Sequence, residues 1–264
     1  MLDYVKETPG VLRTNIEQYT TLVDPLMKEV QQKEIKRILL VASGSSHNAC
    51  YCARSFVEKV SGLEVRIITP YTFTYYENDI KEDDLVLVVT QSGLSTNAIE
   101  ALKIIKKKEC KAICLTGNKN SDVKDVADVV IEYGVGEELV GYVTKGVSSL
   151  ALFLDLFAIA YSGKIEYLDE LKKAADLNEE MIDQATNFIQ RHYKNFTSMS
   201  WVYSCGAGAN YGTALESALK MGETIHIPSC CYEIEEYIHG PNLQLTPQYL
   251  SLIHISEPTR RRGI

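Results

Sequence analysis

The sequence has little positive charge for its length. Among 264 residues, 27 are Lys or Arg and 35 are Asp or Glu, which gives a formal net charge of −8. An acidic chain has no general electrostatic attraction to nucleic acid or to an anionic membrane, so we expect neither as a partner. A phosphate-bearing ligand would have to be held by local groups, such as hydroxyls, backbone N–H groups and helix N-termini.

Paired cysteine motifs are missing as well. The chain has no C-x-x-C pair, and its seven cysteines are Cys50, Cys52, Cys110, Cys114, Cys205, Cys230 and Cys231. The number is odd and most lie in apolar stretches, so free thiols in a reducing compartment are expected.

No targeting segment is evident in the sequence. The first residues, MLDYVKETPG, contain no basic region followed by an apolar run, so no secretory signal is predicted. The most apolar stretch, residues 147–160, contains Asp155 and is too short to span a bilayer. We therefore expect a cytoplasmic protein.

Two nucleotide-binding motifs are absent. No loop has the G-x-x-x-x-G-K-[ST] spacing, which excludes a P-loop nucleotide hydrolase. The segment Gly206-Ala207-Gly208 approaches G-x-G-x-x-G, but Tyr211 stands at the third glycine position. A nicotinamide-dependent dehydrogenase is therefore not expected, and we predict neither a cofactor nor a metal ion.

The chain does have an alternation of short apolar strands with amphipathic helices. Apolar positions at helical spacing predict a first helix over about 10–32, a long apolar helix over 145–161 and a charged helical stretch over 167–193. Between them the pattern predicts helices over about 48–60 and 96–107 and five strands, within 35–46, 64–69, 83–93, 110–117 and 126–134. This alternation indicates a parallel sheet covered on both faces. The predicted fold class is α/β, with a doubly wound, flavodoxin-like, five-stranded parallel sheet.

The pattern then begins again. Residues 201–223 repeat the strand, small-residue loop and helix of residues 38–60, with Gly44 and Gly206 in equivalent places, which predicts an internal duplication. The predicted parts are an N-terminal helical segment (1–30), a first domain (31–165), a linking helix (166–197) and a second, incomplete domain (198–249).

The last residues resemble no protein motif. Residues 250–260, LSLIHISEPTR, resemble the translation of a sequencing-library adapter, and residues 261–264 would be further read-through. We expect 250–264 to be a non-native, adapter-derived tail outside the fold, the alternative being a natural basic tail. The natural protein would then continue past Tyr249, and this form would be inactive or poorly folded in its second half.

Two of the predicted strand ends are rich in small hydroxyl residues. Residues 43–46, SGSS, and residues 90–96, TQSGLST, each lie between a strand and a helix. Ligands of open parallel sheets bind at the carboxyl ends of the strands. Both loops offer hydroxyls and the free N–H groups of a helix N-terminus, and glycine lets an anion approach the backbone. One such turn is usually only a helix cap, but two at corresponding places favour an anion site.

These loops resemble those of sugar-isomerase (SIS) domains. The 90–96 loop looks like the S-Q-S-G-[ED]-[ST] phosphate loop of that superfamily, and Glu138 with residues 141–145, GYVTK, resembles its last loop and helix start. The resemblance covers about 30–249 and implies phosphate and sugar contacts from Ser45, Ser46, Thr90, Gln91, Ser92, Ser95 and Glu138. Leu94 stands where the family has an acidic residue, which suggests a different ligand or neighbour.

Three later residues resemble elements of the isomerase half of glucosamine-6-phosphate synthase, also called glutamine–fructose-6-phosphate aminotransferase. They are Lys220 and Glu223, in a K-x-x-E pattern, and His239, in H-G-P. The resemblance implies that Glu223 moves a proton between C1 and C2 of the sugar and that Lys220 can stabilise developing negative charge on a sugar oxygen. It implies that His239 opens the sugar ring in the site of a neighbouring subunit, and hence a homodimer or larger assembly.

Simpler interpretations of these residues remain open. A Lys and a Glu three residues apart most often form a solvated ion pair, and a His before Gly-Pro is usually a turn residue. Local hydrogen bonding is expected of His47 and His226, and Lys145 is expected to open the long apolar helix.

Two classes of function follow. The first is an enzyme that isomerises, deaminates or deglycates an amino-sugar or glycated-amine 6-phosphate, as fructoselysine-6-phosphate deglycases and glucosamine-6-phosphate deaminases of the superfamily do. The chain begins Met1-Leu2-Asp3, without the N-terminal cysteine of the synthase's glutaminase domain, so we expect no ammonia transfer from glutamine by that route. The alternative is a non-catalytic sugar-phosphate sensor, against which Glu223 and His239 argue.

Overall fold

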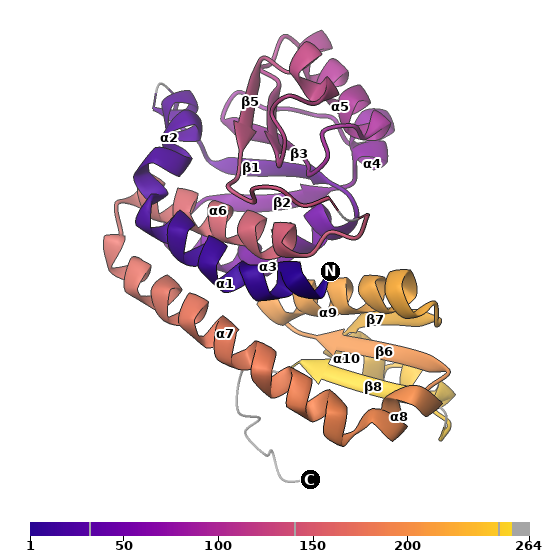
Figure 1. The fold of residues 1–264 in the computed structure, drawn as a ribbon. Helices are drawn as coiled ribbons and strands as arrows, with labels where there is room; N and C mark the ends of the chain where they lie inside the picture. The colour runs from indigo at the N-terminus through magenta and orange to yellow at the C-terminus, as the bar shows by residue number, and fades with distance from the viewer. Residues whose placement is uncertain (32, 140, 248, 255–264) are drawn as a thin grey trace. The chain divides into compact units, whose positions relative to one another are not determined.

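The computed structural model describes residues 1–31, 33–139, 141–247 and 249–254 (Figure 1). The chain divides into two compact units, Met1–Phe188 and the part from Ile189 onward. Each unit is described by itself.

The first unit is built on a parallel sheet. Its strands are β1 (Arg37–Ala42), β2 (Glu64–Ile68), β3 (Asp84–Thr90), β4 (Ile113–Thr116) and β5 (Val129–Glu132), in the order β2-β1-β3-β4-β5. This is the flavodoxin-like order, so the predicted five-stranded parallel sheet is confirmed. The strand order reverses between β1 and β3, and the loops that follow these two strands are the hydroxyl-rich ones.

Helices cover both faces of this sheet (Figure 1). On one face lie α1 (Leu2–Glu17), α2 (Tyr19–Val30), α3 (Gly44–Ser61) and α6 (Lys145–Ser162), and on the other lie α4 (Pro70–Tyr75), α5 (Thr96–Lys107) and the short helix Asp122–Asp125. Side chains of β1 alternate between the two cores, since Ile38 and Leu40 join the first and Leu39 and Val41 join the second. A strand buried on both faces explains why β1 is apolar at nearly every position.

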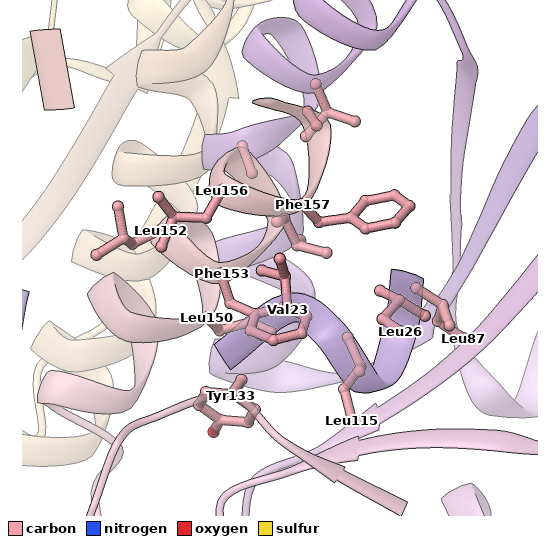
Figure 2. Packing of buried hydrophobic residues seen from close by; sticks show 14 of the residues in the cluster. Val23, Leu26, Leu87, Leu115, Tyr133, Leu150, Leu152, Phe153, Leu156 and Phe157 are labelled. Carbon is pink, nitrogen blue, oxygen red and sulfur yellow. The ribbon is translucent and has the colours of Figure 1, made fainter. Parts of the chain in front are cut away.

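Helix α6 is the centre of the larger core. Its Leu150, Phe153 and Phe157 are almost fully buried, and Figure 2 shows them among side chains of α2 and the sheet. Its 18 residues are long and apolar enough to cross a membrane, but 61% of them are buried inside this domain. The helix is apolar nearly all round because other elements surround it.

The N-terminal helices differ from the expectation of one helix over about 10–32. The structure has α1 from Leu2 and α2 from Tyr19, separated at Gln18. Pro9 and Gly10 look like a helix start in the sequence, yet α1 runs through them and Pro9 is buried. Packing of α1 against α6 through Leu12 and Ile16 outweighs the local preference.

A buried ion pair joins the starts of β1 and β3. Arg37 donates two hydrogen bonds to the Asp84 carboxylate, at 2.8 and 2.7 Å. Burial opposes the charged carboxylate, but the bonds from Arg37 and from the Lys81 amide leave the pKa of Asp84 below its ordinary value. The pair fixes the register of the two strands whose far ends carry the hydroxyl-rich loops.

The second unit has a smaller parallel sheet of its own, and the predicted duplication stays a prediction. After the long helix α7 (Leu168–Arg191) and the short α8 (Tyr193–Ser198) come β6 (Trp201–Gly206), α9 (Ala209–Lys220), β7 (Ser229–Glu233), α10 (Ile234–Ile238), the short helix Pro241–Gln244 and β8 (Tyr249–His254). The three strands are parallel in the order β7-β6-β8, which matches β2-β1-β3. The nearer counterpart of Gly44 is Gly208 rather than Gly206, because both lie two residues after a strand and have positive φ, +56° and +58°.

The end of the chain differs from the expectation. We expected one clear strand in the second unit and residues 250–264 outside the fold, but β7 is present and residues 249–254 form β8 along β6. An apolar run can pair with an open strand edge whatever its origin. The rest of the predicted adapter-derived tail, 255–264, lies outside the described residues, and its origin stays a prediction.

Candidate functional site

A cavity of about 1040 Å³ lies at the carboxyl edge of the first sheet. The loops after β1, β3, β4 and β5 line it, and no Lys, Arg or His of the described chain is among the lining residues. Of the predicted contacts, the cavity is lined by Ser45, Ser46, Thr90, Gln91, Ser92 and Glu138. Ser95, the N-cap residue of α5, is not among the lining residues.

The loop after β1 turns directly into α3. Ser43 is extended and Gly44 has a φ of +56°, a conformation that glycine adopts without strain. Ser45 and Ser46 are buried in the first turn of α3. The N-terminus of an α-helix favours an anion through its first N–H groups and the helix dipole, so the start of α3 is suited to a phosphate in the cavity.

His47 follows these serines but has a local role. Its Nδ1 lies 3.5 Å from the Asn48 side-chain oxygen, and burial lowers its pKa. The expectation of local hydrogen bonding is confirmed for this residue.

The loop after β3 is held by its own contacts. The Ser92 hydroxyl accepts a hydrogen bond from the Leu94 amide at 3.2 Å, and Gly93 has a φ of +66°. A Cβ on Gly93 would lie 1.7 Å from the Ser121 hydroxyl, so no side chain fits there. The loop therefore holds the Thr90 and Ser92 hydroxyls and the start of α5 in fixed positions.

Glu138 caps the start of helix α6. Its carboxylate accepts hydrogen bonds from the amides of Thr144, Lys145 and Gly146 at 2.6, 3.1 and 3.1 Å. A carboxylate at a helix N-terminus satisfies N–H groups that lack helical partners and interacts favourably with the helix dipole. Lys145 is the first residue of α6, as expected.

Gln91 joins this cap to the sheet. Its Nε2 donates to Glu138 at 2.6 Å, and its Oε1 accepts from the Tyr133 hydroxyl at 3.1 Å. Burial raises the pKa of Tyr133, so this hydroxyl stays protonated as a donor. The side chains of Gln91 and Glu138 thus hold the walls of the cavity together. We did not predict Tyr133 as part of the site, because a tyrosine at the end of an apolar strand looks like a core residue.

Gly146 leaves room for the Gln91 side chain and its two hydrogen bonds. Replacing Gly146 with alanine is therefore expected to lower the free energy of unfolding by about 1–3 kcal/mol. The added Cβ would lie 1.8 Å from Gln91 Oε1 and would displace that side chain from its two partners. Urea denaturation measures the change. Gly10→Ala is the matched control, because its Cβ meets nothing within 4 Å and alanine is favoured in a helix by about 1 kcal/mol. Equal effects of the two variants would contradict the proposed clash.

The second unit holds the other three candidates. Lys220 Nζ lies 2.6 Å from the Glu223 carboxylate and 3.2 Å from that of Glu216, so Lys220 and Glu223 form the ion pair that their spacing allows. Glu223 lies within a π-helical turn, Met221–Ile225, a feature found frequently at functional sites. The exposed His239 ends α10, and His226 ends the π-helical turn with a φ of +61°. The catalytic roles of Glu223, Lys220 and His239 stay predictions.

Metal chemistry finds no support in the described ranges. Within them, no group of three His, Cys, Asp or Glu residues is arranged to hold a metal ion.

Comparison with known proteins gives a consistent result. Residues 33–160 match the SIS domain family. The isomerising glutamine–fructose-6-phosphate aminotransferase of Thermotoga maritima is 29% identical over 219 residues, which cover 79% of this chain and 36% of that protein. The corresponding enzyme of Caldanaerobacter subterraneus is 28% identical over 217 residues, with the same coverage. The chain thus spans little more than a third of the length of these relatives.

Solved structures agree with this fold. A protein provisionally named a phosphosugar isomerase, from Clostridium difficile 630, has a TM-score of 0.87 and 27% identity, covering 97% of this chain and 76% of that one. The C-terminal domain of the aminotransferase from Francisella tularensis has a TM-score of 0.80 at 22% identity, covering 96% and 74%. At that identity the second likeness concerns the fold alone.

Proposed function

We propose that the chain binds a phosphorylated sugar at the carboxyl edge of its first sheet, because residues 33–160 match the SIS domain family and supply the residues that line the cavity there. The observation that carries the proposal is the pair of hydroxyl-rich loops on either side of the switch point between β1 and β3. They bring serine and threonine hydroxyls and the N-terminus of α3 to one cavity. Because no basic side chain of the described chain lines that cavity, neutral donors and the dipole of α3 would hold the phosphate.

We propose that the phosphorylated sugar is a 6-phosphate of an amino sugar or of a glycated amine, and that the chain isomerises, deaminates or deglycates it. Glu223 would move the proton and Lys220 would stabilise the negative charge, which their ion pair and the π-helical turn support. Leu94 and Leu139, which line the same cavity and are 57% and 80% exposed, would suit a less polar group attached to the sugar. The protein would act in the cytoplasm as a homodimer, with His239 serving the partner's site.

A non-catalytic sensor is the second candidate. The observation that favours it is structural: all cavity-lining residues belong to the first unit, whereas Glu223, Lys220 and His239 belong to the second. A binding site without a proton-transfer group would suffice for a sensor.

Hexose 6-phosphates are expected to stabilise the protein, and the unphosphorylated sugars are not. At a hundredfold excess over Kd a bound ligand adds about 2.7 kcal/mol to the free energy of unfolding. Thermal unfolding with fructose 6-phosphate, glucosamine 6-phosphate, fructose, glucosamine and inorganic phosphate measures this. Ser92→Leu should abolish the shift, because it removes a hydroxyl and fills the cavity.

Ser55→Leu is the control for that substitution, because Ser55 is exposed on α3 and does not line the cavity. Equal shifts with and without the phosphate, or loss of the shift in both variants, would count against the phosphate site.

A further inference from the structure

The N-terminal helix α1 contacts the loop between β5 and α6, and we infer that Tyr4, Glu7 and Asn15 are positioning residues that hold this loop over the sugar cavity. The inference rests on the proposed sugar-phosphate site and adds a group of residues that act on it from outside. The loop forms a large part of the cavity wall. Eight residues of this loop line the cavity: Glu138 and residues 134–137, 139, 141 and 143.

The loop has little backbone structure of its own. Its described residues form no helix or strand, and none of those from 134 to 143 makes a backbone–backbone hydrogen bond. Behind it lies a second cavity of about 390 Å³, lined by Glu7, Asn15 and Lys145 among others. Besides the buried Val135 and the cap formed by Glu138, the loop is therefore held by separate side-chain contacts.

Helix α1 supplies these contacts at the beginning, middle and end of the loop. Asn15 donates from Nδ2 to the Gly134 carbonyl at 3.0 Å, and the Leu139 amide donates to the Tyr4 hydroxyl at 3.0 Å. Lys145 donates to Glu7 at 2.8 Å. Positions 4, 7 and 15 lie on one side of an α-helix, so a single face of α1 makes all three contacts.

Two of these contacts leave the groups involved little room to move. Gly134 has a φ of +78°, and a Cβ there would lie 2.7 Å from the Asn15 amide, so the two groups are closely fitted. Lys145 is only 5% exposed, and its ammonium lies between the Glu7 carboxylate and the Tyr4 ring, 4.9 Å from the ring centroid. A buried cation needs both partners, since it has given up its hydration.

The position of α1 does not depend on these polar groups. Its apolar Leu12 and Ile16 are buried in the main core, and α1 packs along α6. Substitutions at Tyr4 or Glu7 should therefore loosen the loop without unfolding the helix. That difference separates a positioning role from a merely structural one.

The experiment compares Tyr4→Phe, Glu7→Gln and Glu7→Ala with Lys6→Gln, an exposed change on the same helix. The first readout is hydrogen exchange of a peptide covering 134–144 in the protein without ligand. We expect up to about tenfold faster exchange in Tyr4→Phe and Glu7→Ala, and a smaller change in Glu7→Gln, which keeps an acceptor for Lys145. The second readout is the Kd for fructose 6-phosphate by calorimetry, which should rise about three- to tenfold in Tyr4→Phe and Glu7→Ala. The urea midpoint should stay unchanged in Tyr4→Phe, which keeps both the Glu7–Lys145 pair and the aromatic ring.

The two readouts separate this inference from the proposed function. If wild-type protein binds no hexose phosphate, the proposed function fails, and the exchange measurement still tests the contacts of α1. Unchanged exchange in Tyr4→Phe and Glu7→Ala, or equal loosening in Lys6→Gln, would overturn the inference. Faster exchange with an unchanged Kd in a protein that binds the sugar phosphate would overturn the positioning role.

Discussion

Replacing Glu223 with glutamine is expected to lower the rate of proton transfer at C1 and C2 of the sugar by about 10²–10⁴-fold, with little change in affinity. Glutamine keeps the shape of glutamate but cannot take up a proton. The wild-type carboxylate lies 2.6 Å from Lys220 Nζ, in the position from which it would take up the proton. The measurement is deuterium incorporation into fructose 6-phosphate in D₂O, which detects proton transfer whatever reaction follows.

Glu216→Gln is the matched control for this variant. Glu216 also contacts Lys220, at 3.2 Å, but lies one helical turn before it. We expect less than a tenfold change there. If wild-type protein binds the sugar phosphate and neither exchanges nor converts it, the sensor is the better interpretation.

The same variant tests the homodimer. If His239 serves the partner's site, inactive Glu223→Gln and His239→Ala proteins should regain up to about a quarter of the wild-type activity when they are refolded together, because mixed dimers contain one site with both groups intact. No recovery, together with active monomers in sedimentation velocity, would contradict a shared site.

Replacing Glu138 with alanine is expected to lower the free energy of unfolding by about 2–4 kcal/mol. Loss of a helix cap costs about 0.5–2 kcal/mol, and each buried polar group left without a partner costs about 1–3 kcal/mol. Here three amides at the start of α6 and the Gln91 side chain lose one acceptor together. Urea denaturation followed by circular dichroism measures the loss.

The neighbouring Glu137 provides the control. It lines the same cavity, but it is exposed and makes no hydrogen bond or ion pair among the described residues. Glu137→Ala should change stability by less than about 0.5 kcal/mol. Glu138→Gln should lie between the two, because it keeps one acceptor oxygen. A Glu138→Ala variant as stable as Glu137→Ala would show that the cap contributes little.

The sheet could be predicted from the sequence because each strand is a short apolar run that ends at a glycine or a hydroxyl residue. The two hydroxyl-rich loops could be placed at one edge because parallel strands end there together. Strand β7 of the second unit could not be predicted, because its sequence, SCCYE, is short and weakly apolar and leads straight into the charged helix α10. A pattern of that kind does not separate a strand from a loop.

Local sequence patterns also could not predict which side chains of the site contact one another. Gln91 and Glu138 were predicted as ligand contacts, yet their side chains bind one another across 47 positions of sequence. The partners of Asn15 and Glu7 lie 119 and 138 positions away. Such pairs depend on how the chain folds back on itself, and a single sequence does not display them.

The separation in sequence between α1 and its contact partners also has a consequence for synthesis of the protein on the ribosome. Helix α1 is made before its partners, because Gly134, Leu139 and Lys145 follow it by more than a hundred residues. At about 5–20 residues per second, the helix waits on the order of ten seconds before these partners exist. Its apolar face, with Leu12 and Ile16, lacks its neighbour α6 during that interval, since α6 is made after the loop. The cavity can therefore close only when translation has passed α6.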